Sequence, residues 1–271
     1  MDRFGPSILV EAGEKKLLFD CGRGVAQRIE QLKIPFTDID ALFLTHLHSD
    51  HTVGIPDLWL TGWARGRKAP LQVWGPTGTQ RMMTHLAEAY QFDIQIRQLD
   101  DKLPPQAVAV VANDIEQGEV YDRAGVKVTA FLVDHGIVKP ALGYRVDFAG
   151  HSVVMSGDTR YSENLIRFAQ KADVLIHEVI DPDSFRAKNP SMSAERLQAI
   201  VGHHTTAELA GRIFTQVKPK LAVYSHIVPA DSADLVPLTR KTYTGPLDVG
   251  VDLMSLEIGE NVTVHRPAAA N

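Results

Sequence analysis

The chain has 271 residues, of which 28 are Lys or Arg and 33 are Asp or Glu, so its formal net charge is −5. This balance excludes a broadly basic nucleic-acid-binding protein, although it leaves room for a local basic patch. Cys21 is the single cysteine, which excludes an intrachain disulfide and a zinc site built from several cysteines. No run of residues reaches the roughly 18 apolar positions of a membrane span.

The first half of the chain is expected to mix short strands with helices. Apolar runs bounded by Gly, Pro, Asn or Asp predict strands at residues 7–10, 17–19, 39–44, 72–74, 108–111 and 114–115. Helical spacing of apolar residues predicts helices at residues 25–32, 53–60 and 79–90. Residues 100–107 contain Pro104-Pro105 and are expected to form a surface crossing.

The second half follows the same pattern. Strands are expected at residues 127–133, 144–148, 152–155, 174–176, 221–224, 253–258 and 262–265. Helices are expected at residues 164–172, 194–201, 207–217 and 233–243. No long linker or shift in composition divides the chain, so we expect a single domain over residues 1–271. Two sheets packed face to face, with helices outside, account for strands that do not alternate strictly with helices.

The most informative stretch is His46-Leu47-His48-Ser49-Asp50-His51, which holds three imidazoles and a carboxylate within six residues. It follows the apolar run 41–44, so it lies on the loop that leaves a buried strand, where α/β proteins place their sites. Burying such groups without partners would cost several kcal/mol for each charged group. Coordination of a cation is the simplest explanation for this cluster.

Three further residues of the same chemical type follow other predicted strands. His135 precedes Gly136, Asp158 lies in Ser156-Gly157-Asp158, and His226 follows the strand at 221–224. Each lies at the point where an apolar strand ends, so these strands are expected to converge on one cleft.

The seven residues are enough for two metal ions if one carboxylate bridges them, as in sites where the ions lie about 3.5–4 Å apart. We assign His46, His48 and His135 to the first ion, and Asp50, His51 and His226 to the second. Asp158 is assigned as the bridge. Ligation by nitrogen and oxygen alone fits Zn²⁺ best, with Mn or Fe as alternatives.

This ligand order, with His135, Gly157-Asp158 and Ser225-His226 at strand ends, resembles the metallo-β-lactamase superfamily over nearly the whole chain. The resemblance implies an α/β (α+β) fold, the four-layer αββα sandwich. It also implies a metal-dependent hydrolase that acts on ester bonds, with a hydroxide held between the two metals as nucleophile.

Finer motifs are similar to ribonuclease Z and its arylsulfatase-like relatives. These are residues 3–7, 20–24 and 143–145, together with His177-Glu178 and His204-Thr205-Thr206. By this resemblance Glu178 orients His204, and His204 is the general acid, with His203 as the fallback. A carboxylate behind an imidazole fixes its tautomer and raises its pKa, which suits that role. Asp50, His204 and Glu178 are therefore the expected catalytic residues.

Two departures from ribonuclease Z bear on the substrate. The basic arm that clamps tRNA is absent between residues 144 and 155, where Ala149-Gly150 predicts a plain hairpin. The second departure is the family's first strand, with its Gly-Thr-Gly stretch, which is expected to be missing ahead of Met1. We therefore expect a small anionic ester as substrate, either a phosphodiester or an aryl sulfate, and do not expect a nucleic acid.

Three alternatives remain open for the activity: tRNA 3′-end processing, lactone or β-lactam opening, and a silent metal-binding sensor. No membrane association is expected, a homodimer is an expectation by analogy, and the compartment stays open between cytoplasm and periplasm. Trp59 and Trp63, four residues apart, form either the core or a wall for an aryl group. Arg65 either attracts an anionic substrate or lies in a solvated loop, and His203 is the remaining candidate for substrate contact.

Overall fold

The computed structural model describes residues 3–267, which divide into two compact units, residues 3–116 and residues 117–267. Each unit contains its own sheet, and each is described separately. No helix among the described residues has the length and apolar character needed to cross a membrane.

The first unit is built on a five-stranded sheet in the order β1-β2-β3-β4-β5. Its strands are β1 (Ile8–Ala12), β2 (Lys15–Phe19), β3 (Ala41–Phe43), β4 (Leu71–Gly75) and β5 (Val110–Asp114). β1 and β2 form an antiparallel hairpin, and the other neighbouring pairs are parallel. Its helices are α1 (Val25–Gln31), η1 (Phe36–Asp38), α2 (Ser49–Thr52), α3 (Ile55–Ala64), α4 (Thr79–Ala89), α5 (Gln91–Leu99) and α6 (Pro105–Val108).

Alternation along the strands divides the side chains of this sheet between two faces. On one face, Leu18 and Leu42 belong to the apolar core that α1 and α3 cover, which also contains Trp59. On the other face, Phe19, Phe43 and Trp74 stack in a row, with neighbouring ring centroids 5.0 and 5.2 Å apart. The strand that leads into the His-rich loop is thus buried and held on both sides.

The second unit is built on a seven-stranded sheet in the order β12-β11-β10-β9-β8-β7-β6. These strands are β6 (Gly118–Arg123), β7 (Val126–His135), β8 (Val138–Phe148), β9 (His151–Met155), β10 (Val174–Ile180), β11 (Leu221–Val228) and β12 (Leu247–Val249). β13 (Ser255–Ile258) and β14 (Val262–His265) form a separate hairpin. The helices are α7 (Glu163–Phe168), α8 (Pro182–Lys188), α9 (Ala194–Val201), α10 (Ala207–Val217) and α11 (Leu235–Thr239).

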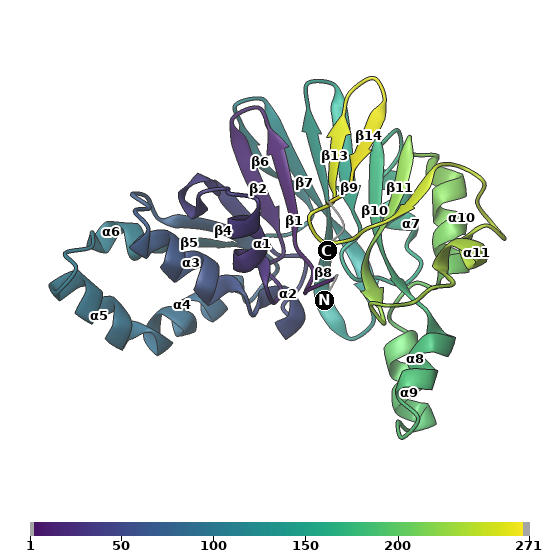
Figure 1. Cartoon of the computed structure of the whole chain (residues 1–271), viewed down its shortest axis with the longest axis horizontal. Helices are drawn as coiled ribbons and strands as arrows, with labels where there is room; N and C mark the ends of the chain where they lie inside the picture. Colours follow the sequence, from purple (N-terminus) through teal and green to yellow (C-terminus); the bar gives the residue numbers. More distant parts are fainter. Residues whose placement is uncertain (1–2, 268–271) are drawn as a thin grey trace. The chain divides into compact units, whose positions relative to one another are not determined.

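Strand direction in this unit explains why its functional side chains gather at one edge. β9, β10, β11 and β12 are parallel, whereas β6 to β9 are joined in antiparallel pairs, so β7 runs in the same direction as β9. The carboxyl ends of β7, β9, β10 and β11 therefore lie along the same edge. α10 packs its apolar face, including Ala210 and Phe214, on the sheet, and α8 and α9 extend beyond the strands (Figure 1).

Most predicted elements are present, and the differences have physical reasons. Residues 91–99 form α5, which the sequence did not predict because the helix has no fully buried residue to mark its periodicity. The two strands expected at 108–111 and 114–115 are one strand, β5. The helix expected at 233–243 is limited to α11, and β6, α8 and β12 were not predicted.

Candidate metal centre

The first unit brings the His-rich residues together just beyond β3. His46 follows the end of β3, and the single turn of α2 carries Asp50 and His51. The ring centroid of His46 lies 4.6 Å from that of His48 and 4.1 Å from that of His51. His51 Nε2 is 3.7 Å from Asp50 Oδ2. His46 and His51 are buried, whereas His48 and Asp50 are exposed, so the cluster has an inner and an accessible side.

Asp20 supports this cluster from behind, a role that the sequence did not reveal. Its buried carboxylate accepts hydrogen bonds from the backbone N–H of Thr45 at 2.8 Å and from the Thr45 hydroxyl. His51 Nδ1 lies 2.8 Å from Oδ2 of the same carboxylate, and His46 Nδ1 lies 3.0 Å from Thr45 Oγ1. Because both Nδ1 atoms are engaged in this way, Nε2 of each ring is the nitrogen that would coordinate a cation, as is usual in metal sites.

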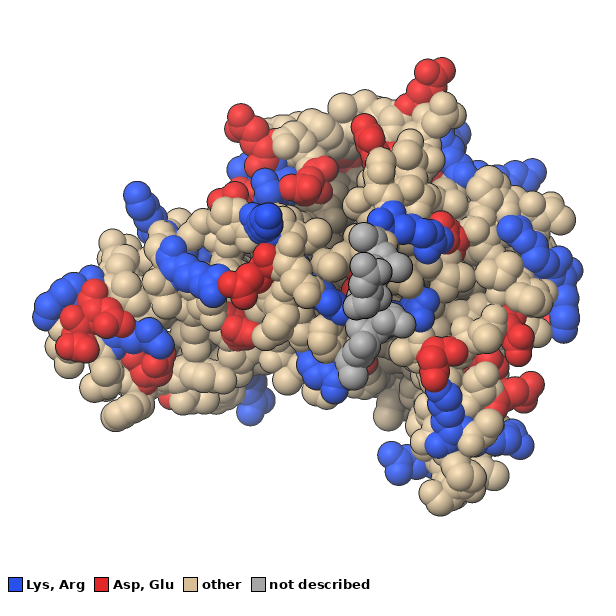
Figure 2. Space-filling view, in the orientation of Figure 1, with Lys and Arg blue, Asp and Glu red and all other residues tan. Residues whose placement is uncertain are grey.

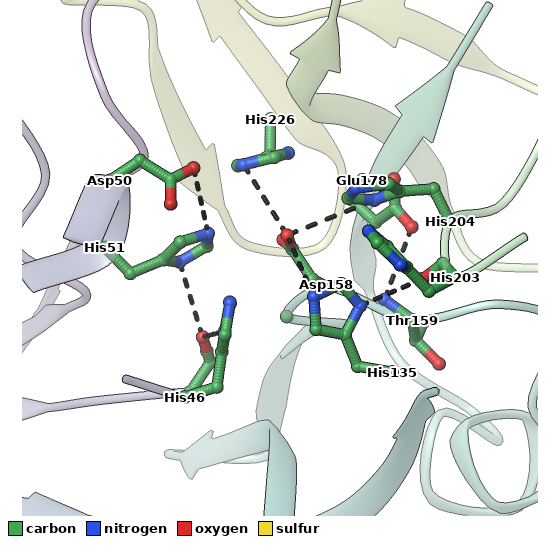
Figure 3. A network of polar contacts seen from close by, with 12 residues as sticks. His46, Asp50, His51, His135, Asp158, Thr159, Glu178, His203, His204 and His226 are labelled. Carbon is green, nitrogen blue, oxygen red and sulfur yellow. Dashed lines mark hydrogen bonds and ion pairs between the residues drawn. The ribbon is translucent and has the colours of Figure 1, made fainter. Parts of the chain in front are cut away.

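The second unit brings His135, Asp158 and His226 together, as Figure 3 shows. Asp158 Oδ2 lies 3.9 Å from His135 Nε2 and 3.6 Å from His226 Nε2. These separations exceed a hydrogen bond, and they suit nitrogen and oxygen donors arranged around a cation. Asp158 is 3% exposed, and its oxygen faces both rings, which is the arrangement that a bridging carboxylate requires.

His135 is fixed in the neutral form that binds metals. Its Nδ1 donates to the His203 carbonyl at 2.9 Å, so Nε2 carries the lone pair. Burial lowers the pKa of His135 to about 4, against the opposing effect of Asp158. The His203 backbone therefore orients a predicted ligand.

Glu178 and His204, which the resemblance to ribonuclease Z pairs, lie in contact. Glu178 Oε2 lies 3.2 Å from His204 Nδ1, and Glu178 Oε1 accepts from the backbone N–H groups of Thr205 at 2.9 Å and Thr159 at 3.3 Å. Burial raises the pKa of Glu178, although the interaction with His204 acts in the opposite direction. Since His204 Nδ1 also lies 4.0 Å from Asp158 Oδ2, the pair adjoins the predicted bridging residue.

The structure does not support a substrate contact for the two tryptophans proposed from the sequence. Trp59 and Trp63 are 1% and 0% exposed, and their indole N–H groups donate to the carbonyls of Val108 and Pro104. The expectation of an aryl-binding wall is therefore wrong for both, and the core-packing interpretation holds. Arg65 is exposed, but its guanidinium pairs with Glu30 at 2.9 Å and lies over the Phe36 ring.

Comparison with known proteins agrees with these observations. Residues 15–227 match the model of the beta-lactamase superfamily domain. A ribonuclease Z of Mycolicibacterium gilvum is 33% identical over 269 residues, which cover 96% of this chain and 92% of that relative.

Two solved structures establish the same fold. The metallo-beta-lactamase fold protein YhfI from Bacillus subtilis has a TM-score of 0.68 at 19% identity, covering 93% of this chain and 91% of that one. The short form of human tRNase Z has a TM-score of 0.67 at 20% identity, covering 93% and 92%. The chain therefore belongs to the β-lactamase superfamily of metal-dependent hydrolases and, within it, to the family of the ribonuclease Z proteins.

Proposed function

We propose that this protein hydrolyses phosphodiester bonds with two divalent cations held by seven side chains. These are His46, His48, Asp50, His51, His135, Asp158 and His226. The observation that carries the proposal is that neighbouring groups engage Nδ1 in His46, His51 and His135, which makes Nε2 the nitrogen that would coordinate a cation. The all-nitrogen and oxygen donor set suits Zn²⁺, with Mn or Fe as alternatives.

When bound, two cations would activate water and neutralise negative charge that develops on the phosphoryl oxygens. The chain's own contribution to bond cleavage is a proton for the departing oxygen. In this proposal His204 donates that proton, and Glu178, 3.2 Å from Nδ1, fixes the tautomer and stabilises the imidazolium. Asp158 would be the carboxylate shared by the two cations.

RNA is the substrate class that the relatives favour, and we propose tRNA 3′-end processing as the leading activity. This revises the expectation that nucleic acid is not a partner. The missing arm had argued against RNA, but 92% of the mycobacterial ribonuclease Z is matched by this chain, so the arm does not separate the two proteins.

β8 and β9 are joined by the tight turn at Ala149-Gly150, as predicted. A small anionic ester remains the second candidate, because one observation favours it. On the face shown in Figure 2, Lys and Arg side chains are interspersed with Asp and Glu and form no continuous basic surface. RNA binding draws its affinity mainly from phosphate contacts, so a face without a continuous basic surface suits a shorter substrate.

One substrate panel separates these candidates. We expect the metal-loaded protein to cleave a precursor tRNA at its 3′ trailer and to act more slowly on bis-nitrophenyl phosphate. Efficient cleavage of the small phosphodiester or of an aryl sulfate, without any cleavage of RNA, would support the second candidate instead. Turnover of nitrocefin or a lactone alone would overturn both.

The role of His204 has its own test. His204→Ala should lower kcat/KM by about 10²–10⁴-fold for esters with poor leaving groups and much less for nitrophenyl esters. His85→Ala, on the exposed surface of α4, is the matched control. An equal loss on both substrate classes would refute the assignment of His204 as general acid.

A further inference from the structure

The strand that carries Glu178 is irregular at that residue. β10 pairs with β11 in parallel from Val174–Leu221 to His177–Tyr224, and the register then shifts before Val179 pairs with Ile227. One residue of β10, Glu178, therefore lies opposite two residues of β11, Ser225 and His226. His226 has a φ of 43°, in the left-handed region that non-glycine residues rarely adopt. Such bulges redirect side chains next to active sites.

Side chains bond to both backbone groups of Glu178 within this bulge. Its N–H donates to Ser156 Oγ at 3.0 Å, and its carbonyl accepts from His177 Nδ1 at 2.6 Å. The Ser156 hydroxyl in turn donates to the Gly157 carbonyl at 2.6 Å. The backbone on both sides of Glu178 is thus held by residues outside the catalytic pair.

His177 occupies a position where an apolar residue would be expected. It is 0% exposed, lies edge-on to the Phe214 ring with centroids 5.9 Å apart, and has no hydrogen-bond partner at Nε2 among the described residues. A buried unsatisfied nitrogen costs about 1–3 kcal/mol, a cost that leucine would avoid. Burial lowers the pKa of His177 to about 4, so the ring is neutral, and the contact with the Glu178 carbonyl requires the hydrogen to be on Nδ1. What the imidazole supplies, and leucine cannot, is the donor to the Glu178 carbonyl.

We infer that His177 is a positioning residue for the Glu178–His204 pair. Its Nδ1–H fixes the Glu178 peptide, and the fixed peptide directs the carboxylate between Thr205 N–H and His204 Nδ1. This inference deepens the proposed function, on which it rests for the role of His204. It assigns His177 no contact with substrate or metal.

The test compares three variants of the full-length, metal-loaded protein. His177→Leu removes the donor at similar volume, His177→Asn keeps an amide N–H near the position of Nδ1, and Phe214→Leu perturbs the same packing without touching the hydrogen bond. Against aryl phosphodiesters of graded leaving-group pKa, His177→Leu should lower kcat by about tenfold or more for the poorest leaving groups, with KM unchanged. His177→Asn should restore most of this loss.

A contradiction would take one of two forms: a loss in His177→Leu that is uniform across leaving groups, or the same leaving-group dependence in Phe214→Leu. If His177→Leu does not fold, the comparison of His177→Asn with the wild type decides. A large, leaving-group-dependent loss in a folded Asn variant would then refute the role of the donor.

Two measurements that do not depend on activity keep this inference distinct from the proposed function. The ¹⁵N spectrum of the wild-type protein should show His177 as the neutral Nδ1–H tautomer, and the Nε2–H tautomer would overturn the inference. Amide exchange at Thr205, whose N–H donates to Glu178 Oε1, should accelerate in His177→Leu and not in His177→Asn. If these results hold while no phosphodiester is cleaved, the proposed function fails and the structural role of His177 stands.

Discussion

His51 and Asp20 are 31 positions apart in the chain, and the structure places His51 Nδ1 2.8 Å from Asp20 Oδ2. The contact depends on the parallel pairing of β2 with β3, in which Phe19 is the partner of Phe43. Asp20 directly follows Phe19, and the loop that carries His51 follows β3. Asp20 also receives the Thr45 N–H, so a single carboxylate orders the loop that carries His46. We regard Asp20 as the residue that orients the first-unit ligands.

Replacing Asp20 should weaken metal binding without removing a ligand. Asp20→Asn loses the charge behind His51, and supporting partners of this kind typically contribute about 10–100-fold in metal affinity. Competition with a chelator measures the change, and Asp38→Asn, on the exposed surface of the same unit, is the control. Equal affinity in the Asp20 and Asp38 variants would show that Asp20 has no part in metal binding.

Removing the proposed bridge should have a larger effect. Asp158→Ala is expected to lose the second metal ion and nearly all turnover, because a bridging carboxylate would belong to both ligand sets. Elemental analysis of the purified variant gives the metal content, with Asp122→Ala, an exposed residue of β6, as the reference. Two retained equivalents in Asp158→Ala would contradict the bridging assignment.

Arg67 is a structural residue, although its neighbours Arg65 and Lys68 are exposed. It is 6% exposed and donates to the carbonyls of Ile39 at 3.0 Å and Phe36 at 2.5 Å. Arg67→Met should lower the free energy of unfolding by about 2–3 kcal/mol, because two buried carbonyls lose a charged donor. Urea denaturation measures this, and the exposed neighbour Lys68→Met should change stability by no more than about 0.5 kcal/mol. Similar values for the two variants would refute the role of Arg67.

Asp173 makes the stability of the second unit depend on pH. Burial by itself raises the pKa of Asp173, but Lys220 at 2.7 Å and the Ser152 N–H at 2.7 Å outweigh it, so the pKa lies below its ordinary value. A carboxyl with a lowered folded-state pKa stabilises above its unfolded pKa of about 3.9, and this stabilisation disappears as pH falls through the folded-state value.

Asp173→Asn should therefore lower the free energy of unfolding by about 1–2 kcal/mol at neutral pH. The difference from the wild type should shrink as pH falls below about 4. Denaturation curves recorded from pH 7 downwards test this, with the exposed Glu195→Gln as control. A difference that is constant across the whole range would mean that the ion pair with Lys220 contributes nothing.

Much of the fold followed from local pattern, and the exceptions are instructive. The β1–β2 hairpin, α1, α4 and α10 appear close to their predicted positions, because each has clear periodicity and a turn or cap at its ends. α5 was not predicted, because it lies mostly on the surface. Trp59 and Trp63 have the same spacing whether they pack in a core or line a pocket, so only their burial distinguished the two interpretations.

The amino-acid sequence alone determined the donor chemistry, since His46, His48, Asp50 and His51 are adjacent in the chain and their side chains limit what they can bind. It also located strand-end residues such as His135 and Asp158, because an apolar run followed by a polar turn is visible without coordinates. The tertiary structure alone decided which groups hold them: Asp20 behind His51, the His203 carbonyl behind His135, and the bulge that presents Glu178 to His204. Those contacts join residues that are far apart in the chain, and strand pairing, which no single stretch of sequence specifies, creates them.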